Sequence, residues 1–337
     1  MPMIDLRSDT VTRPTPAMLK AMAEAELGDD VFDDDPTVDR LEALVAETLG
    51  KEASMFVPSG TQSNLAALMT HCGRGDEYLV GQQAHTYLFE GGGAASLGSI
   101  QPQPIDQEDD GTLDLKKLAT LIKPDDYHYA RTRLLCLENT TWGKVLPQKY
   151  LAAAKSFADK YGLALHLDGA RIFNAAVEQG ISAIEIATPF DSVSVCLSKG
   201  LGCPVGSVLA GSANFVKEAR RWRKMLGGGM RQSGILAAAG IHALQHHVDR
   251  LAEDHANASL LADGLAAIEG IKVAPVQTNM VFATVAEHKV GGLAEHLKQR
   301  GILIMAPIAD ALRLVTHLDL DADAIRTAVE TFGEYLA

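Results

Sequence analysis

Two stretches, His166-Leu167-Asp168-Gly169-Ala170-Arg171 and Ser198-Lys199-Gly200, decide the fold of this chain. Each follows a short apolar run, 163–167 and 192–197, of the kind that forms buried strands in a parallel sheet. In open α/β sheets, ligands bind in the crevice outside the carboxyl ends of the strands. We therefore predict that Asp168 and Lys199 share one crevice.

An aspartate and a lysine at the same sheet edge are typical of chemistry with pyridoxal phosphate. A lysine among small residues can approach a cofactor carbonyl and form a Schiff base. An anionic aspartate can keep a pyridine nitrogen protonated, which makes the ring an electron sink. The alternative is a surface lysine and a helix-capping aspartate. Because Lys199 stands between Ser198 and Gly200, it covers no apolar surface and caps no helix, which favours the cofactor hypothesis.

Composition excludes several classes of protein. The 337 residues are 47% hydrophobic and 22% charged, which is ordinary for a globular chain with room for one large core or two domains. We expect a soluble, cytoplasmic protein, because no apolar run approaches the ~20 residues of a membrane span and the N-terminus lacks a signal-peptide layout. The net charge of −13 argues against nucleic acid and membrane partners and favours a small-molecule substrate. The four cysteines form no C-x-x-C pair, so we predict neither disulfides nor a metal site.

The chain divides into three parts. Residues 1–14 are too short and polar to fold alone and are expected to dock on the body. Residues 15–250 predict a large α/β cofactor-binding domain, with a mostly parallel sheet flanked by helices and a long helix from about 232 to 265. Residues 251–337 predict a small α+β domain. Within the large domain, residues 28–36 carry five aspartates and predict a solvated acidic loop, with cation binding as the less favoured alternative.

Three further sites carry candidate functional groups. The turn at 59–64 opens a helix with small residues, and the free N–H groups of such a turn can hold a phosphate, although many similar turns bind nothing. His85 follows a predicted strand and could stack on a flat ring, or could be structural. Arg313 lies on a predicted strand of the small domain and could clamp a carboxylate, although spacing alone favours an ordinary surface arginine.

Taken together, these stretches resemble one family. The motifs at 6–12, 59–61, 166–171, 198–202 and 227–232 are similar to those of the low-specificity L-threonine aldolases, and the resemblance covers essentially the whole chain. It implies the aspartate-aminotransferase fold (fold type I) and pyridoxal phosphate as the cofactor. It also implies retro-aldol cleavage of L-threonine, L-allo-threonine and other L-β-hydroxy-α-amino acids to glycine and an aldehyde.

The resemblance assigns the cofactor site. Lys199 would form the Schiff base, Asp168 would pair with the pyridinium nitrogen, and His85 would stack on the ring. Gly60 and Thr61 would bind the phosphate.

The resemblance also assigns a substrate site. Ser8, Arg171 and Arg313 would hold the substrate carboxylate, with Arg171 also close to the cofactor. His128 would lie near the substrate hydroxyl. The general base stays open among His85, His128 and an ordered water.

Family members are typically homotetramers, built as dimers of dimers with active sites that take residues from both chains. By resemblance, Lys224 and Arg231 would approach such a subunit boundary. The chain departs from the family pattern at Phe32, where tyrosine is usual, and at Thr141-Trp142, where His-Asn is usual. These departures affect local hydrogen bonding and substrate preference, and they leave Lys199 and Asp168 untouched.

Two alternatives remain at this point. One is another pyridoxal-phosphate enzyme of the same fold, such as a β-eliminating lyase or an aminotransferase, because fold and cofactor do not determine the reaction. The other is a non-catalytic effector-binding module, which would need an attached nucleic-acid-binding domain. No basic helix-turn-helix segment precedes residue 15.

Overall fold

A seven-stranded sheet forms the centre of the larger of two lobes. The computed structural model describes residues 3–307 and 310–336, so the expected parts 1–14 and 251–337 include a few residues outside the described ranges. The sheet order is β2-β8-β7-β6-β5-β3-β4, and only β8 runs antiparallel to its neighbours. The strands are β2 (Ala53–Val57), β3 (Asp76–Gly81), β4 (Gln101–Ile105), β5 (Arg131–Glu138), β6 (Ala164–Asp168), β7 (Ser192–Cys196) and β8 (Ser207–Gly211). The expected mostly parallel sheet is confirmed.

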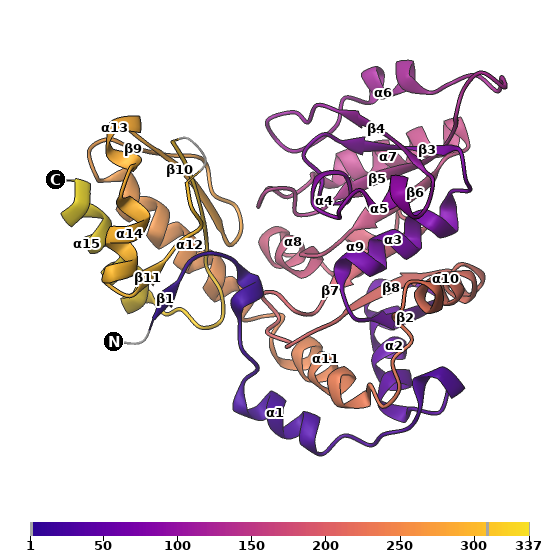
Figure 1. The fold of residues 1–337 in the computed structure, drawn as a ribbon, viewed down its shortest axis with the longest axis horizontal. Coiled ribbons are helices and arrows are strands. Elements are labelled where there is room, and N and C mark those ends of the chain that lie inside the picture. The colour runs from indigo at the N-terminus through magenta and orange to yellow at the C-terminus, as the bar shows by residue number, and fades with distance from the viewer. Residues whose placement is uncertain (1–2, 308–309, 337) are drawn as a thin grey trace.

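Helices cover this sheet and extend from it (Figure 1). β7 and β8 are buried along their whole length, which explains their continuous apolar runs. The helices of the large lobe are α1 (Pro16–Ala23), α2 (Pro36–Leu49), α3 (Gly60–His71), α4 (His85–Leu88), α5 (Gly93–Ser96), α6 (Leu115–Leu121), α7 (Gln148–Tyr161), α8 (Ile172–Gln179), α9 (Ala183–Ala187), α10 (Ala213–Met225) and α11 (Gly234–His246). None of the helices in the described ranges is long and apolar enough to cross a membrane.

The small lobe has a core of its own, in which Ile4 and Leu6 pack with residues of 258–336. Figure 1 shows the indigo N-terminal segment beside this orange and yellow lobe before it crosses to α1. The segment adds β1 (Ile4–Asp5) to β11 as a parallel pair. The other elements are α12 (Leu251–Ala266), β9 (Ile271–Val273), β10 (Met280–Val285), α13 (Glu287–Val290), α14 (Leu293–Gln299), β11 (Ile302–Leu303), β12 (Ala311–Val315) and α15 (Ala322–Leu336).

Two sequence expectations are wrong. The single helix over 232–265 is two helices, α11 and α12, and the chain between them is anchored by buried His247, whose Nδ1 donates to the Leu201 carbonyl at 2.8 Å. The loop at 28–36 is not simply solvated, because Asp30 and Asp35 are buried. Asp30 pairs with Arg223 at 3.0 Å, and Asp35 caps α2. These carboxylates hold the loop in place.

Candidate active site

Asp168 and Lys199 come together where β6 and β7 end. Asp168 is the last residue of β6 and pairs in register with Ser194 of β7, and Lys199 follows β7 by three residues. Lys199 Nζ donates to Cys196 Sγ at 3.5 Å. The two strand ends that the sequence predicts to be neighbours are therefore adjacent in the fold.

Asp168 is a buried carboxylate without a cationic partner among the described residues. Its side chain accepts hydrogen bonds from Asn64 Nδ2 at 2.8 Å and from the Ala170 backbone at 3.1 Å. The residue is 3% exposed, and a buried charge is normally paired. A protonated ring nitrogen would supply that missing positive charge, so the site fits a pyridinium group.

His85 begins α4 and lies beside two acidic residues. Its Nδ1 contacts Glu90 Oε1 at 2.8 Å, and its backbone N–H donates to Glu138 Oε2 at 2.7 Å. The hydrogen bond with Glu90 raises the pKa of His85. One ligand-type atom each from His85, Glu90 and Asp168 lies within 4.8 Å of the others, so the imidazole is next to the carboxylate.

The two neighbouring glutamates hold protons more tightly than ordinary carboxyl groups. Burial raises the pKa of Glu138 to about 7, and the charge of Asp168 on the adjacent strand acts in the same direction. Burial also raises the pKa of Glu90, and its hydrogen bond with His85 partly offsets this effect. Asn64 joins the groups, since its Nδ2 also donates to Glu90 at 2.8 Å.

Gly60 and Thr61 form the first turn of α3, next to the lysine. Ser59 caps this helix by accepting from Gln62 N–H, and among the described residues the N–H groups of Gly60 and Thr61 have no hydrogen-bond partner. A Cβ built at Gly60 would lie 2.6 Å from Cys196 Sγ, so only glycine fits there. Free N–H groups at the positive end of a helix suit a phosphate.

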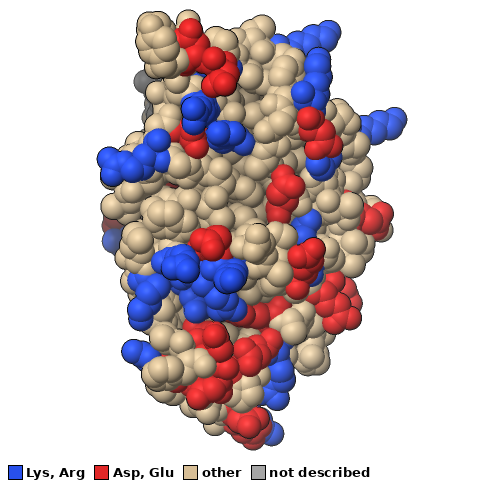
Figure 2. Space-filling view, turned by 90° about the vertical axis from the view of Figure 1, so that its right-hand side faces the viewer, with Lys and Arg blue, Asp and Glu red and all other residues tan. Residues whose placement is uncertain are grey.

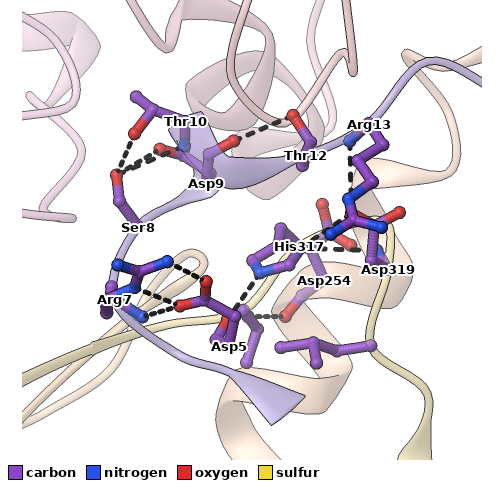
Figure 3. A network of polar contacts seen from close by, with 12 residues as sticks. Asp5, Arg7, Ser8, Asp9, Thr10, Thr12, Arg13, Asp254, His317 and Asp319 are labelled. Carbon is purple, nitrogen blue, oxygen red and sulfur yellow. Dashed lines mark hydrogen bonds and ion pairs between the residues drawn. The ribbon is translucent and has the colours of Figure 1, made fainter. Parts of the chain in front are cut away.

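Hydrogen bonds to Asp9 of the N-terminal segment connect the two lobes. Arg171 donates to buried Asp9 through Nε and Nη2, both at 2.7 Å, and Asn279 of the small lobe donates to the same carboxylate at 3.2 Å. Burial alone would raise the pKa of Asp9, but Arg171 and Lys199 outweigh it and hold this pKa well below its usual range. Figure 3 shows Asp9 beside Ser8, which accepts from the backbone N–H and the hydroxyl of Thr10.

Arg313 lies near this group. Its Nη1 donates to the Arg7 carbonyl at 3.1 Å. Burial lowers the pKa of Arg313, and the positive charge of Arg171 adds to that effect. The fold therefore brings Ser8, Arg171 and Arg313 close together, although two of the donor groups of Arg171 are already hydrogen-bonded to Asp9.

His128 does not join the cluster of its own chain. It precedes β5, whereas Glu138 ends that strand. A strand rises about 3.3 Å per residue, so the eight residues of β5 separate these two positions by roughly 23 Å. His128 instead contacts Asp126 at 2.6 Å in an exposed loop. Its predicted contact with a substrate bound to the same chain therefore lacks support, because β5 carries it to the opposite sheet edge.

Lys224 and Arg231 lie on the outer surface, on α10 and in the loop that follows. Arg231 pairs with Asp29 at 3.1 Å and lies 5.8 Å from the ring of Phe32, which is 75% exposed. Figure 2 shows Lys and Arg side chains gathered at the level of α10, with Asp and Glu directly below them. The structure brings neither residue into contact with Lys199 or Asp168 in the described part of the chain.

Sequence reasoning missed Asn64, Glu90, Glu138 and Asp9. Glu138 ends β5 just as Asp168 ends β6, so the strand-end rule could have found it. Asp9 lies within the 6–12 motif, but its partner is 162 residues away. Nothing in the local pattern marks Asn64 or Glu90.

Comparisons with known proteins identify the family of the chain. The family model described as beta-eliminating lyase matches residues 5–288. The chain is 57% identical over 335 residues to the low specificity L-threonine aldolase of Escherichia coli K12, covering 99% of this chain and 100% of that protein. The chain belongs to the low-specificity L-threonine aldolases. The resemblance expected from the motifs is thereby confirmed, and with it membership of a pyridoxal-phosphate-dependent family of carbon–carbon lyases.

Further members of the aldolase family match along their length. The low-specificity L-threonine aldolase 1 of Arabidopsis thaliana is 43% identical over 342 residues, covering 98% of this chain and 96% of that protein. The solved structure of Leishmania major threonine aldolase has a TM-score of 0.85 at 21% identity, with 99% of this chain and 100% of that chain covered. At this identity the structural match bears on the fold alone. It confirms the fold that the resemblance implied.

Proposed function

We propose that this protein cleaves L-threonine, L-allo-threonine and related L-β-hydroxy-α-amino acids to glycine and an aldehyde, with pyridoxal phosphate as its cofactor. One observation carries the proposal. Lys199 and the buried Asp168, which has no cationic partner among the described residues, lie at the ends of adjacent strands, with His85 beside them. This arrangement, in a chain 57% identical to a low specificity L-threonine aldolase, favours aldol cleavage over β-elimination or transamination.

The residues present fit the cofactor. Lys199 would hold it covalently, Asp168 would face its ring nitrogen, and His85 would cover a face of the ring. The N–H groups of Gly60 and Thr61 would take its phosphate. When bound, the cofactor supplies an electron sink for the pair of electrons left on Cα as the Cα–Cβ bond breaks.

The arginines orient the substrate. A guanidinium binds a carboxylate in a fixed, forked geometry. Arg313 offers donors from β12, Arg171 is held by Asp9, and Ser8 adds a hydroxyl. A clamped carboxylate determines which bond of Cα stands perpendicular to the ring, and this choice selects cleavage to an aldehyde.

His85 is the group that accepts the proton of the β-hydroxyl. An ionised Glu90 can only accept a hydrogen bond, so Nδ1 of His85 carries the proton that faces it. Nε2 is then free to act as a base, in the manner of an imidazole oriented by a carboxylate. Glu138 holds the backbone of His85 in place.

The assembly and location complete the proposal. We infer a cytoplasmic homotetramer, built as a dimer of dimers, in which Lys224 and Arg231 approach a subunit boundary. Both residues are exposed on this chain, and the exposed ring of Phe32 is next to Arg231. His128 can serve a site in such an assembly only through a neighbouring chain.

Product analysis with the four threonine stereoisomers tests the activity. We expect equimolar glycine and acetaldehyde from both L-isomers and none from the D-isomers, since the clamp sets the configuration at Cα. Discrimination between the L-isomers should be partial, because one methyl group changes binding by about 1–3 kcal/mol. Formation of 2-oxobutyrate and ammonia would indicate elimination instead, and comparable cleavage of D-threonine would overturn the substrate orientation.

A further inference from the structure

A run of aromatic rings extends from the proposed base to the carboxylate clamp. The ring of Phe89 is 5.8 Å from His85, and the Trp142 ring is 6.2 Å from Phe89. Phe282 follows at 5.7 Å from Trp142. These spacings are those of interacting aromatic pairs.

Both ends of this run lie at residues of the proposed active site. His85 lies at one end, next to Asp168 and Glu90. At the other end, Phe282 of β10 is directly opposite Arg313 of β12 in the strand register, so both side chains stand on the same face of that sheet. If Arg313 binds the substrate carboxylate and His85 the β-hydroxyl, as proposed, the substituent of Cβ would face the rings between them.

Trp142 is fixed in this position by its backbone and its indole. Nε1 donates to the Gln83 carbonyl at 3.1 Å, and the next carbonyl, of Gly143, accepts from Thr278 of the small lobe at 2.8 Å. Trp142 adopts φ +50°, a left-handed conformation that is unfavourable for a bulky side chain. Such strain persists where the surroundings enforce it and is frequent at binding sites.

The rings keep apolar surface available. Phe89 is 56% exposed, and Trp142 is partly exposed. A flat apolar group between them would remove that surface from water and stack on the rings. Asparagine at position 142 would offer no aromatic face.

We propose that Trp142, with Phe89 and Phe282, forms a subsite for the Cβ substituent and shifts selectivity towards β-hydroxy amino acids that carry an aromatic ring. The inference rests on the proposed aldol cleavage and names its substrate class. Trp142 contacts the substituent, whereas His85 and Arg313 act on groups that all substrates share. The residue should therefore affect the choice between substrates more than the common chemistry.

Steady-state kinetics with L-threonine and L-threo-β-phenylserine test the subsite in the holoenzyme. We expect W142N and W142L to lower kcat/KM for phenylserine by roughly 2- to 10-fold, the range of one lost aromatic pair, with a smaller change for threonine. W142F keeps a flat ring and should keep the ratio of the two kcat/KM values close to that of the wild type. W142L distinguishes aromatic stacking from general apolar contact, because leucine is apolar but has no aromatic face.

Product inhibition gives a second measurement that does not depend on turnover of phenylserine. The inhibition constant of benzaldehyde should rise in W142N and W142L, and that of acetaldehyde should stay constant. A ratio unchanged in both variants, or an equal loss for both substrates, would overturn the subsite. So would a change of oligomeric mass in W142N with an unchanged ratio, since a second copy would then cover the rings. A wild-type protein that cleaves neither amino acid would instead refute the proposed function.

Discussion

Replacing Asp9 by asparagine measures the contribution of a buried ion pair. The same replacement at Asp5 measures a surface ion pair on the same short segment. Asp9 is fully buried, and its carboxylate takes two hydrogen bonds of 2.7 Å from Arg171. The substitution preserves the shape of the side chain but removes its charge. The Arg171 side chain, only 12% exposed, would remain buried next to a neutral amide.

The expected cost follows from burial. Removing one partner of a buried pair costs about 3–5 kcal/mol, because the other charge stays desolvated without compensation. Asp5 supplies a matched control, since it pairs with Arg7 at 2.6 Å, but that arginine side chain is 47% exposed. An exposed pair contributes only about 0–1 kcal/mol. Figure 3 shows both aspartates on the same segment, four residues apart.

Urea denaturation of the purified protein at pH 7 measures both changes. We expect D9N to lose several times more free energy of unfolding than D5N, and KM for L-threonine to rise in D9N as Arg171 loses its anchor. Because the pKa of folded Asp9 lies below the ordinary value of about 3.9, its contribution is complete above that pH and is lost as the pH falls below it. The difference between wild type and D9N should therefore shrink in acid. Equal destabilisation by D9N and D5N would refute this account.

Other substitutions address the chemical roles one at a time. Lys199→Ala should abolish the visible absorption of the bound cofactor, and borohydride reduction of the wild type should label the peptide containing Lys199; a label elsewhere would contradict the assignment. Asp168→Asn should fold but cleave L-threonine very slowly, and near-normal turnover would exclude its role at the ring nitrogen. Glu90→Gln replaces the carboxylate that raises the pKa of His85 by a neutral amide, so the acid limb of kcat/KM should move to lower pH; an unmoved limb would separate His85 from the proton transfer. Arg313→Ala should cost about 3 kcal/mol of transition-state stabilisation, which lowers kcat/KM more than 100-fold with the cofactor retained. Loss of the cofactor instead would place this arginine at the phosphate.

The centre of the site could be predicted because it depends on strand ends. Parallel strands with buried apolar runs must align their carboxyl ends, so Asp168 and Lys199 meet whatever the details of the loops. The periodicity of the C-terminal part led us to predict a small α+β domain, but it gave no indication that Ile4 packs with residues of that part. The break between α11 and α12 lies at a tertiary hydrogen bond from His247 to Leu201, a contact that the local sequence pattern cannot reveal.

The polar network around the centre could not be predicted, because each partner comes from a different element. Asn64 lies on α3, Glu90 follows α4, and Asp9 lies in the N-terminal segment. Their spacing in sequence carries no signal of contact. His128 was assigned from the family resemblance alone, and the resemblance did not indicate that it precedes β5 whereas Glu138 ends that strand.

The charges around the substrate site explain why a buried aspartate accompanies two arginines. Arg171 lowers the pKa of Arg313, after the larger effect of burial, so the two guanidinium groups repel each other. Asp9 neutralises one of them by its two hydrogen bonds with Arg171. The positive charge of Arg313 then remains to bind one substrate carboxylate, because its own hydrogen bonds are to neutral acceptors, the Arg7 carbonyl and Met305 Sδ. Without Asp9, two unpaired cations would share a largely buried space, and binding a single carboxylate could compensate only one of them.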